Sequence, residues 1–477
     1  MKGAALILAT LWLLAACSRG PAKDASTPTP PPSSAASLVG EAASATPTAT
    51  APPAPGPSAT TRPAFDPGPV ILPTVAIPTP TPTPVPDHPQ ATLLDNLARQ
   101  TTIVRNLFAQ KHIEREFITR KQLQDRFAAL LEKDREDIAK DEALYRALGV
   151  LTPESDLYGL LLAMYGEGVL GFYDADQDKL FLVQDKPELR PGDHLTYVHE
   201  YAHALQQQYF DIRAKREELK SNHDRAAAFR ALIEGDASVT EVVYMFNFLS
   251  DQERTEAAET AQNASSEAFD SAPHLVQRGF VFPYFEGYQF VGRLLQQTGD
   301  WNLVNQAYQD PPASTEQILH QQKYLDREPP VVVSLPDVAR ALGEGWTELR
   351  RNTLGELTLL AYLESKLFNE RASLASTGWG GDSYSLLQGP EGQNVLVALI
   401  TWDSGGDAQE FFDAFVEFTS LLMGGQWEMV DGNAKRLQLV QPGRSVLISI
   451  DSLDTLVLIA PDAATIQRVR TAIDQGA

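Results

Sequence analysis

The stretch YVHEYAHALQQQYFD, residues 197–211, carries two histidines four positions apart, with a glutamate directly after the first. Apolar residues recur around it at helical spacing, which predicts a partly buried helix over 193–211. Residues four apart in a helix lie one turn above each other on the same face. His199 and His203 can therefore bind one metal ion, and the stretch predicts a fold organised around a buried helix that carries a metal site.

Glu200 gives the same helix a candidate base. It lies about 100° around the helix from His199, which makes it a poor ligand for the same ion. It can instead take a proton from a metal-bound water, because the metal lowers the pKa of that water. The alternative is a core histidine pair that matches the pattern by chance. Buried histidine beside glutamate costs free energy unless each group is paired or binds metal, so we favour the metal site.

A catalytic zinc needs a third protein ligand and an open fourth position. No third histidine follows His203 within the next eight residues, ALQQQYFD. A second helix, expected over 222–248, offers Glu234 in an otherwise apolar, alanine-rich surrounding. Gly235 beside it allows two backbones to approach closely. The alternative reading of Glu234 is a core acid paired with Arg230.

Two further acids on the same helix compete with Glu234 for a role at the metal. Glu241 lies seven residues on, near the same face, and suits a hydrogen bond that orients a ligand histidine. Asp236 lies on a different face and is a second candidate for orienting a histidine.

The quoted stretch and ALIEGDA (231–237) occur in order with three other segments, namely GFYD (171–174), FPYFEGYQFV (282–291) and PPASTEQILH (311–320). Together they resemble the gluzincin branch of the zincin metallopeptidases, and in particular its exported and lipoprotein bacterial members. The resemblance extends over about residues 100–330.

This resemblance implies that His199, His203 and Glu234 bind one Zn²⁺ per chain and that Glu200 is the general base. It also implies a small sheet before the active-site helix, whose edge strand pairs with an extended peptide substrate. GVLGFYD, residues 168–174, is our candidate for the strand beside the cleft.

The sequence leaves two roles open. Gluzincins commonly carry a second acid four residues after the ligand glutamate, but that position is Ser238 here, so the choice between Asp236 and Glu241 stays open. A donor to the tetrahedral oxyanion is also needed. Tyr284, Tyr288 and His320 are the candidates; we expect His320 or Tyr288, with core packing as the alternative role of the tyrosines.

The N-terminus predicts export. Met1-Lys2 precedes an apolar run that ends in Leu14-Ala15-Ala16-Cys17, which resembles the bacterial lipobox and implies cleavage before Cys17 and acylation of its thiol. Cys17 is the sole cysteine; the alternative is a plain secretory signal. Twenty of the 33 prolines fall within 18–90, a composition that cannot form a core and predicts a disordered tether. No later segment is apolar for long enough to cross a bilayer.

We therefore expect an α+β protein: a signal peptide over 1–17, the tether over 18–90, a mainly helical zincin-like domain with a small β-sheet over 91–371, and a smaller α+β domain over 372–477. Residues 91–148 have helical periodicity, and 168–183 predicts a hairpin. The C-terminal part has strand-like runs with two helices and no histidine, so metal chemistry is not expected there.

The net charge of −23 disfavours nucleic acid as a partner, because no basic stripe is present. The sequence predicts an extracytoplasmic zinc metallopeptidase, held on the cell membrane by lipid at Cys17, that cleaves peptide bonds of a protein or peptide substrate. The alternative is a non-catalytic envelope lipoprotein with a structural zinc site. A third hypothesis is a processing enzyme kept latent by its C-terminal unit.

Overall fold

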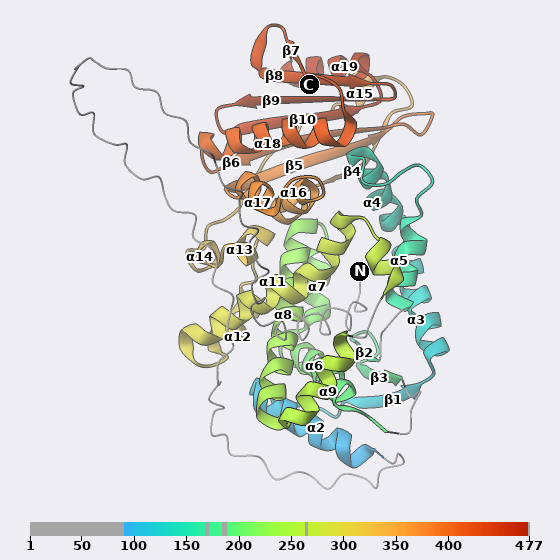
Figure 1. The fold of residues 1–477 in the computed structure, drawn as a ribbon, viewed down its shortest axis with the longest axis vertical. Coiled ribbons are helices and arrows are strands. Elements are labelled where there is room, and N and C mark those ends of the chain that lie inside the picture. The colour runs from blue at the N-terminus through green and yellow to red at the C-terminus, as the bar shows by residue number, and fades with distance from the viewer. Residues whose placement is uncertain (1–89, 167–170, 184–187, 263–265, 476–477) are drawn as a thin grey trace, which may run out of the picture.

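The computed structural model describes residues 90–166, 171–183, 188–262 and 266–475. The predicted signal peptide, Cys17 and almost all of the predicted tether lie outside these residues. Within the described ranges, helices dominate the first part of the chain, and a large antiparallel sheet dominates the last part (Figure 1). The predicted α+β class is confirmed. No helix in the described part is long and apolar enough to span a membrane.

The region predicted to be helical over 91–148 also contains a strand. It forms α2 (Ala91–Arg105), α3 (Arg120–Lys133) and α4 (Arg135–Leu148), but Glu114–Ile118 is strand β1. β1 pairs in parallel with β3, with Phe117 opposite Leu182. This pairing partner lies more than sixty residues away, which explains why local periodicity did not reveal the strand.

The predicted hairpin is present where it is described. After α5 (Leu157–Gly166), β2 (Gly171–Asp174) pairs antiparallel with β3 (Lys179–Val183). The strand order of this small sheet is β1-β3-β2, so β2 lies at an edge. The predicted strand began at residue 168, and 168–170 lie outside the described residues.

Three long helices form the centre of the first part: α6 (Pro191–Phe210), α8 (His223–Phe248) and α11 (His274–Thr298). The last of these begins ten residues before the predicted start at 284. The shorter helices are α7 (Ile212–Leu219), α9 (Asp251–Gln262), α10 (Glu267–Ser271), α12 (Asn302–Gln309), α13 (Thr315–Leu319) and α14 (Gln321–Leu325).

α8 and α11 cross with their backbones in contact. A Cβ added to Gly235 would overlap the carbonyl group of Gly287, and one added to Gly287 would overlap the carbonyl oxygen of Ala231. The close approach expected at Gly235 is therefore present, and it fixes the depth at which α8 presents Glu234.

The C-terminal part is one seven-stranded antiparallel sheet with helices on both faces (Figure 1). The strand order is β4-β5-β6-β10-β9-β8-β7. The strands are β4 (Thr347–Asn352), β5 (Trp379–Gln388), β6 (Asn394–Trp402), β7 (Glu428–Val430), β8 (Asn433–Gln441), β9 (Arg444–Asp451) and β10 (Asp454–Ala460). The helices are α15 (Ala339–Leu342), α16 (Gly355–Glu364), α17 (Asn369–Ser376), α18 (Gly405–Met423) and α19 (Ala463–Asp474).

The expected boundary at residue 372 falls inside this unit. β4 belongs to the sheet, and it precedes that boundary together with α16. Successive residues of each inner strand point to opposite faces: Leu386 joins the core beneath α18, and Leu387 joins the core beneath α19. The core beneath α18 continues without a break into the core of the helical part.

Buried polar contacts also join the two parts. Asp382 of β5 accepts the backbone N–H groups of Leu354 and Gly355, each at 2.8 Å. Gly355 has a φ of +78° and lies against Asp224 at the start of α8, where a Cβ would overlap the carboxylate. Arg350 of β4 contacts acids of α4. The first turn of α8 is thus packed directly on the C-terminal unit.

Candidate metal centre

α6 and α8 place a buried group of potential metal ligands at the centre of the helical part. Pro191 occupies the first turn of α6, and the side chain of Asp193 accepts the N–H of Arg190. His199 and Glu234 are only 1% and 2% exposed. Ligand atoms of His199, His203 and Glu234 all lie within 4.8 Å of one another.

Each histidine has its Nδ1 atom engaged by an acceptor. His199 Nδ1 lies 3.1 Å from Glu241 Oε2. His203 Nδ1 lies 2.8 Å from Gln206 Oε1, and Gln206 Nε2 donates to the carbonyl of Ile233. These acceptors require a proton on Nδ1, which leaves the lone pair of each Nε2 atom available for a cation.

Both Nε2 atoms face the same carboxylate oxygen. Glu234 Oε2 lies 3.4 Å from His199 Nε2 and 3.2 Å from His203 Nε2. The buried Nε2 of His203 makes no hydrogen bond among the described residues. Two imidazoles whose Nε2 atoms converge on one carboxylate form a set of donors that fits a metal ion.

The charges of this group affect one another strongly. Burial lowers the pKa of His199, but its contacts with Glu234 and Glu241 outweigh burial and raise that pKa to about 10. Burial favours a higher pKa for Glu234, but the charges and hydrogen bonds of the two histidines hold it far below its usual range. Glu234 therefore stays ionised, as a ligand must be.

Glu200 lies beside these three residues and is also 1% exposed. Its Oε2 accepts the backbone N–H of Tyr173, in edge strand β2, at 2.7 Å. Its Oε1 has no hydrogen-bond partner in the described part of the chain. Burial raises the pKa of Glu200 to about 8. One oxygen is thus fixed by the sheet and the other is available to a reactant.

The two candidate orienting acids differ in their contacts. Glu241 contacts His199, as described. Asp236 contacts neither histidine: it accepts from Arg105 at 2.6 Å and from Tyr308 at 2.7 Å. Its expected role at a histidine is wrong, because Arg105 is fully buried and requires this carboxylate. Gln206 was missed from the sequence, although its position three residues after His203 on one helix was an available signal.

The structure does not bring the two expected oxyanion donors to the site. His320 lies between α13 and α14, and its Nε2 is 2.8 Å from Glu356 Oε1. Tyr288 is packed in the core one turn of α11 beyond Tyr284. Neither lines the cavity that contains Glu200. Tyr284 is nearer, with its ring centroid 6.3 Å from that of His199, but it does not line the cavity either.

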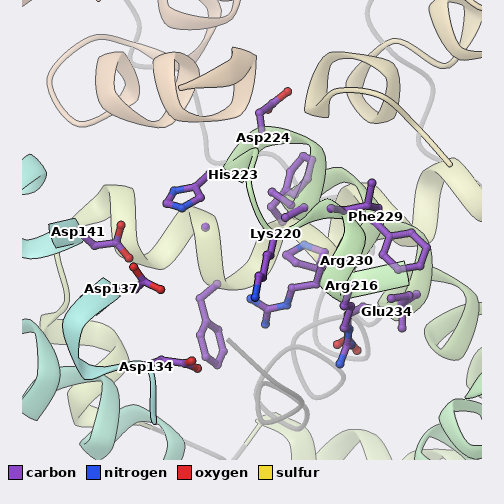
Figure 2. A pocket seen from close by; sticks show the side chains of 18 of the residues that line it. Asp134, Asp137, Asp141, Arg216, Lys220, His223, Asp224, Phe229, Arg230 and Glu234 are labelled. Carbon is purple, nitrogen blue, oxygen red and sulfur yellow. The ribbon is translucent and has the colours of Figure 1, made fainter. Parts of the chain in front are cut away.

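A cavity of about 480 Å³ opens beside the candidate ligands (Figure 2). Glu200, His203 and Glu234 line it, and β2 contributes Phe172, Tyr173 and Asp174. The C-terminal unit also contributes to the wall, through Thr353, Leu354, Leu357, Thr358 and Tyr384.

Comparison with known proteins identifies a relative for only one part of the chain. Residues 342–470 match the model of a family described as a domain of unknown function (DUF8575). The match is confined to the C-terminal unit. It covers all seven strands of the large sheet and includes the cavity-lining residues of that unit, but none of the candidate ligands. No curated protein and no solved structure matches the chain.

Proposed function

We propose that this protein is a zinc-dependent peptidase of the gluzincin type, with a zincin-like helical domain. One observation carries the proposal: two buried Nε2 atoms and Glu234 converge on one point, and a second glutamate with a free oxygen lines the same cavity. Two imidazoles and one carboxylate are the protein ligands of several catalytic zinc sites.

Three residues would bind the metal, and a fourth would transfer the proton. His199, His203 and Glu234 would hold Zn²⁺, which supplies Lewis acidity and lowers the pKa of a water when bound. Glu200 accepts the proton of the attacking water through its free Oε1, while the N–H of Tyr173 holds Oε2. Glu241 and Gln206 keep the two imidazoles in the required tautomer and orientation.

The surroundings of the site support a peptide as the substrate. β2 is an edge strand, and its N–H at Tyr173 reaches Glu200, so an extended chain beside β2 would pass close to the base. The cavity has the size of a typical small-ligand pocket and suits a short segment of an unfolded chain. We further propose, from the sequence alone, that lipid at Cys17 holds the enzyme outside the cytoplasm on the membrane.

A purely structural zinc site is the second candidate function. Such a site uses all its ligands for the metal and has no use for a buried glutamate with an unpartnered oxygen. Keeping Glu200 in this state costs free energy. We therefore favour the catalytic function over the structural one.

Metal analysis and peptide cleavage by the full-length protein test this proposal. We expect about one zinc per chain, lost in His199→Ala and Glu234→Ala because each removes a ligand. Glu200→Gln keeps the shape of the side chain and is expected to retain zinc but lose cleavage. Glu218→Gln, an exposed acid on α7, is the control for both measurements. Full cleavage by Glu200→Gln would refute the base role, and unchanged zinc in the ligand variants would refute the metal site.

A further inference from the structure

Two arginines line the cavity close to the candidate metal ligands. Arg230 lies on α8 one turn before Glu234, and Arg216 lies on the neighbouring helix α7. Both are half-buried, and both face the cavity. Figure 2 shows them near each other, next to Glu234.

Neither arginine forms an ion pair or hydrogen bond with an acid in the part of the chain that the structure describes. Glu234 is the acid whose charge acts to raise the pKa of both arginines. However, its Oε2 lies between the two histidines, and in the proposed function it binds the metal. Burial and the charge of Arg230 lower the pKa of Arg216, while Glu234 opposes this change. Two cations held together without an anion cost free energy in a partly buried place.

Several of the other charged groups around the cavity are paired. The acids of α4 lie across the cavity from the arginines (Figure 2). Of these, Asp137 and Asp141 contact Arg350. On the near side, Lys220 pairs with Glu217. The described wall of the cavity therefore presents two guanidinium groups without an acidic partner of their own, close to Glu200 and the candidate metal ligands.

We propose that Arg216 and Arg230 form a binding subsite for a carboxylate of the substrate, so that the enzyme prefers peptides with a negative charge near the cleaved bond. This inference rests on the proposed peptidase function and adds its substrate class. A guanidinium group presents parallel N–H donors that match the two oxygens of a carboxylate. In a peptide, that carboxylate comes from an Asp or Glu side chain or from the free C-terminus.

The binding test uses full-length protein carrying Glu200→Gln, which retains the site without cleaving. Fluorescent peptides are compared in matched pairs: internal Glu against Gln, and a free C-terminus against an amidated one. We expect the carboxylate form of one pair to bind about 10- to 100-fold more tightly, as charged hydrogen bonds of this kind contribute. Adding Arg216→Gln or Arg230→Gln should reduce that ratio to about one. Arg225 is an exposed arginine on α8, the helix of Arg230. Arg225→Gln is therefore the control and should preserve the ratio.

The responding pair identifies the source of the carboxylate. A response to the C-terminus indicates removal of terminal residues, and a response to internal Glu indicates cleavage beside acidic residues. Equal binding of both members in both pairs overturns the subsite, as does a preference that survives both arginine substitutions. Zinc content of each variant reports whether the site has folded. Failure of the peptidase function would appear separately, as absence of cleavage by the unsubstituted protein.

Discussion

At the residue scale, the orientation of the candidate ligands depends on groups outside the candidate ligand set. Glu241 fixes His199, and Gln206 fixes His203 through an amide that is itself held by the carbonyl of Ile233. Both orienting groups come from the two helices that also supply the ligands, so the site needs no loop to complete its ligand set.

Glu241→Gln tests this role. An amide at this position cannot match the charge of the carboxylate at His199 Nδ1, so we expect zinc affinity to fall by about 10- to 100-fold. Competition with a zinc-binding dye measures the change. Asp236→Asn is the comparison: it weakens the buried contact with Arg105 and should lower stability, while folded protein keeps its zinc affinity. A larger loss of affinity in Asp236→Asn than in Glu241→Gln would reverse the assignment.

The sequence predicted the candidate ligands for two reasons. Helical spacing places His199 and His203 on the same face, and Glu234 stands out as an acid in an otherwise apolar helix. It could not choose between Asp236 and Glu241, because that choice depends on Arg105, which is 131 residues away from Asp236. His320 and Tyr288 were favoured from a family resemblance, and the contacts of His320 with Glu356 are tertiary features that no local pattern encodes.

At the element scale, the crossing of α8 and α11 determines where Glu234 lies. Gly287→Ala should force the two helices apart, since its Cβ would overlap the backbone of Ala231. We expect a loss of about 1–3 kcal/mol in the free energy of unfolding, measured by urea denaturation, together with weaker zinc binding. Gly279→Ala on the same helix meets no atom within 4 Å and should be neutral or stabilising. Equal losses in the two variants would contradict a specific role of the close crossing at Gly287.

Elements with strong local patterns were predictable, and short edge elements were not. α6, α8 and the β2–β3 hairpin match their predicted positions within a few residues. β1, β4 and β7 are short or lie at sheet edges, so their conformation depends on partners distant in sequence. β4, which lies before the expected boundary at residue 372, pairs with β5 of the large sheet.

At the scale of the whole molecule, the two parts depend on each other. A chain that ends at residue 371 would keep β4 and α16 but lose the strand that pairs with β4 and the carboxylate that holds the start of α16. We expect such a chain to be aggregated or to show a much lower melting temperature than the full-length protein. A stable, zinc-binding chain of this length would contradict the shared core, and only then could truncation test latency.

The buried contact of Asp224 with the C-terminal unit should make the stability of the protein depend on pH. Burial raises the pKa of Asp224 to about 7, although hydrogen bonds from Thr315 oppose the shift. The unfolded chain releases this proton near pH 4, so between about pH 4 and 7 the folded state binds more protons. This contribution to stability is therefore lost as pH rises through that range.

Asp224→Asn isolates this contribution. The unfolding free energy of the unsubstituted protein should fall more between pH 5 and pH 8 than that of the variant, because a buried Asn at this position cannot ionise. Urea denaturation at the two pH values measures both slopes. Parallel slopes would show that Asp224 does not titrate in this range.

The cavity wall supplied by the C-terminal unit also has a consequence for the timing of biosynthesis. Tyr384 and Leu354 lie in or beside the large sheet. The last strand of this sheet in the sequence is β10, which pairs with β6 and ends at Ala460. Residues up to Ala460 must therefore have left the ribosome before this wall of the cavity can form. If the proposed peptidase function is correct, we expect the nascent chain to be inactive until the strands up to β10 have been synthesised and folded.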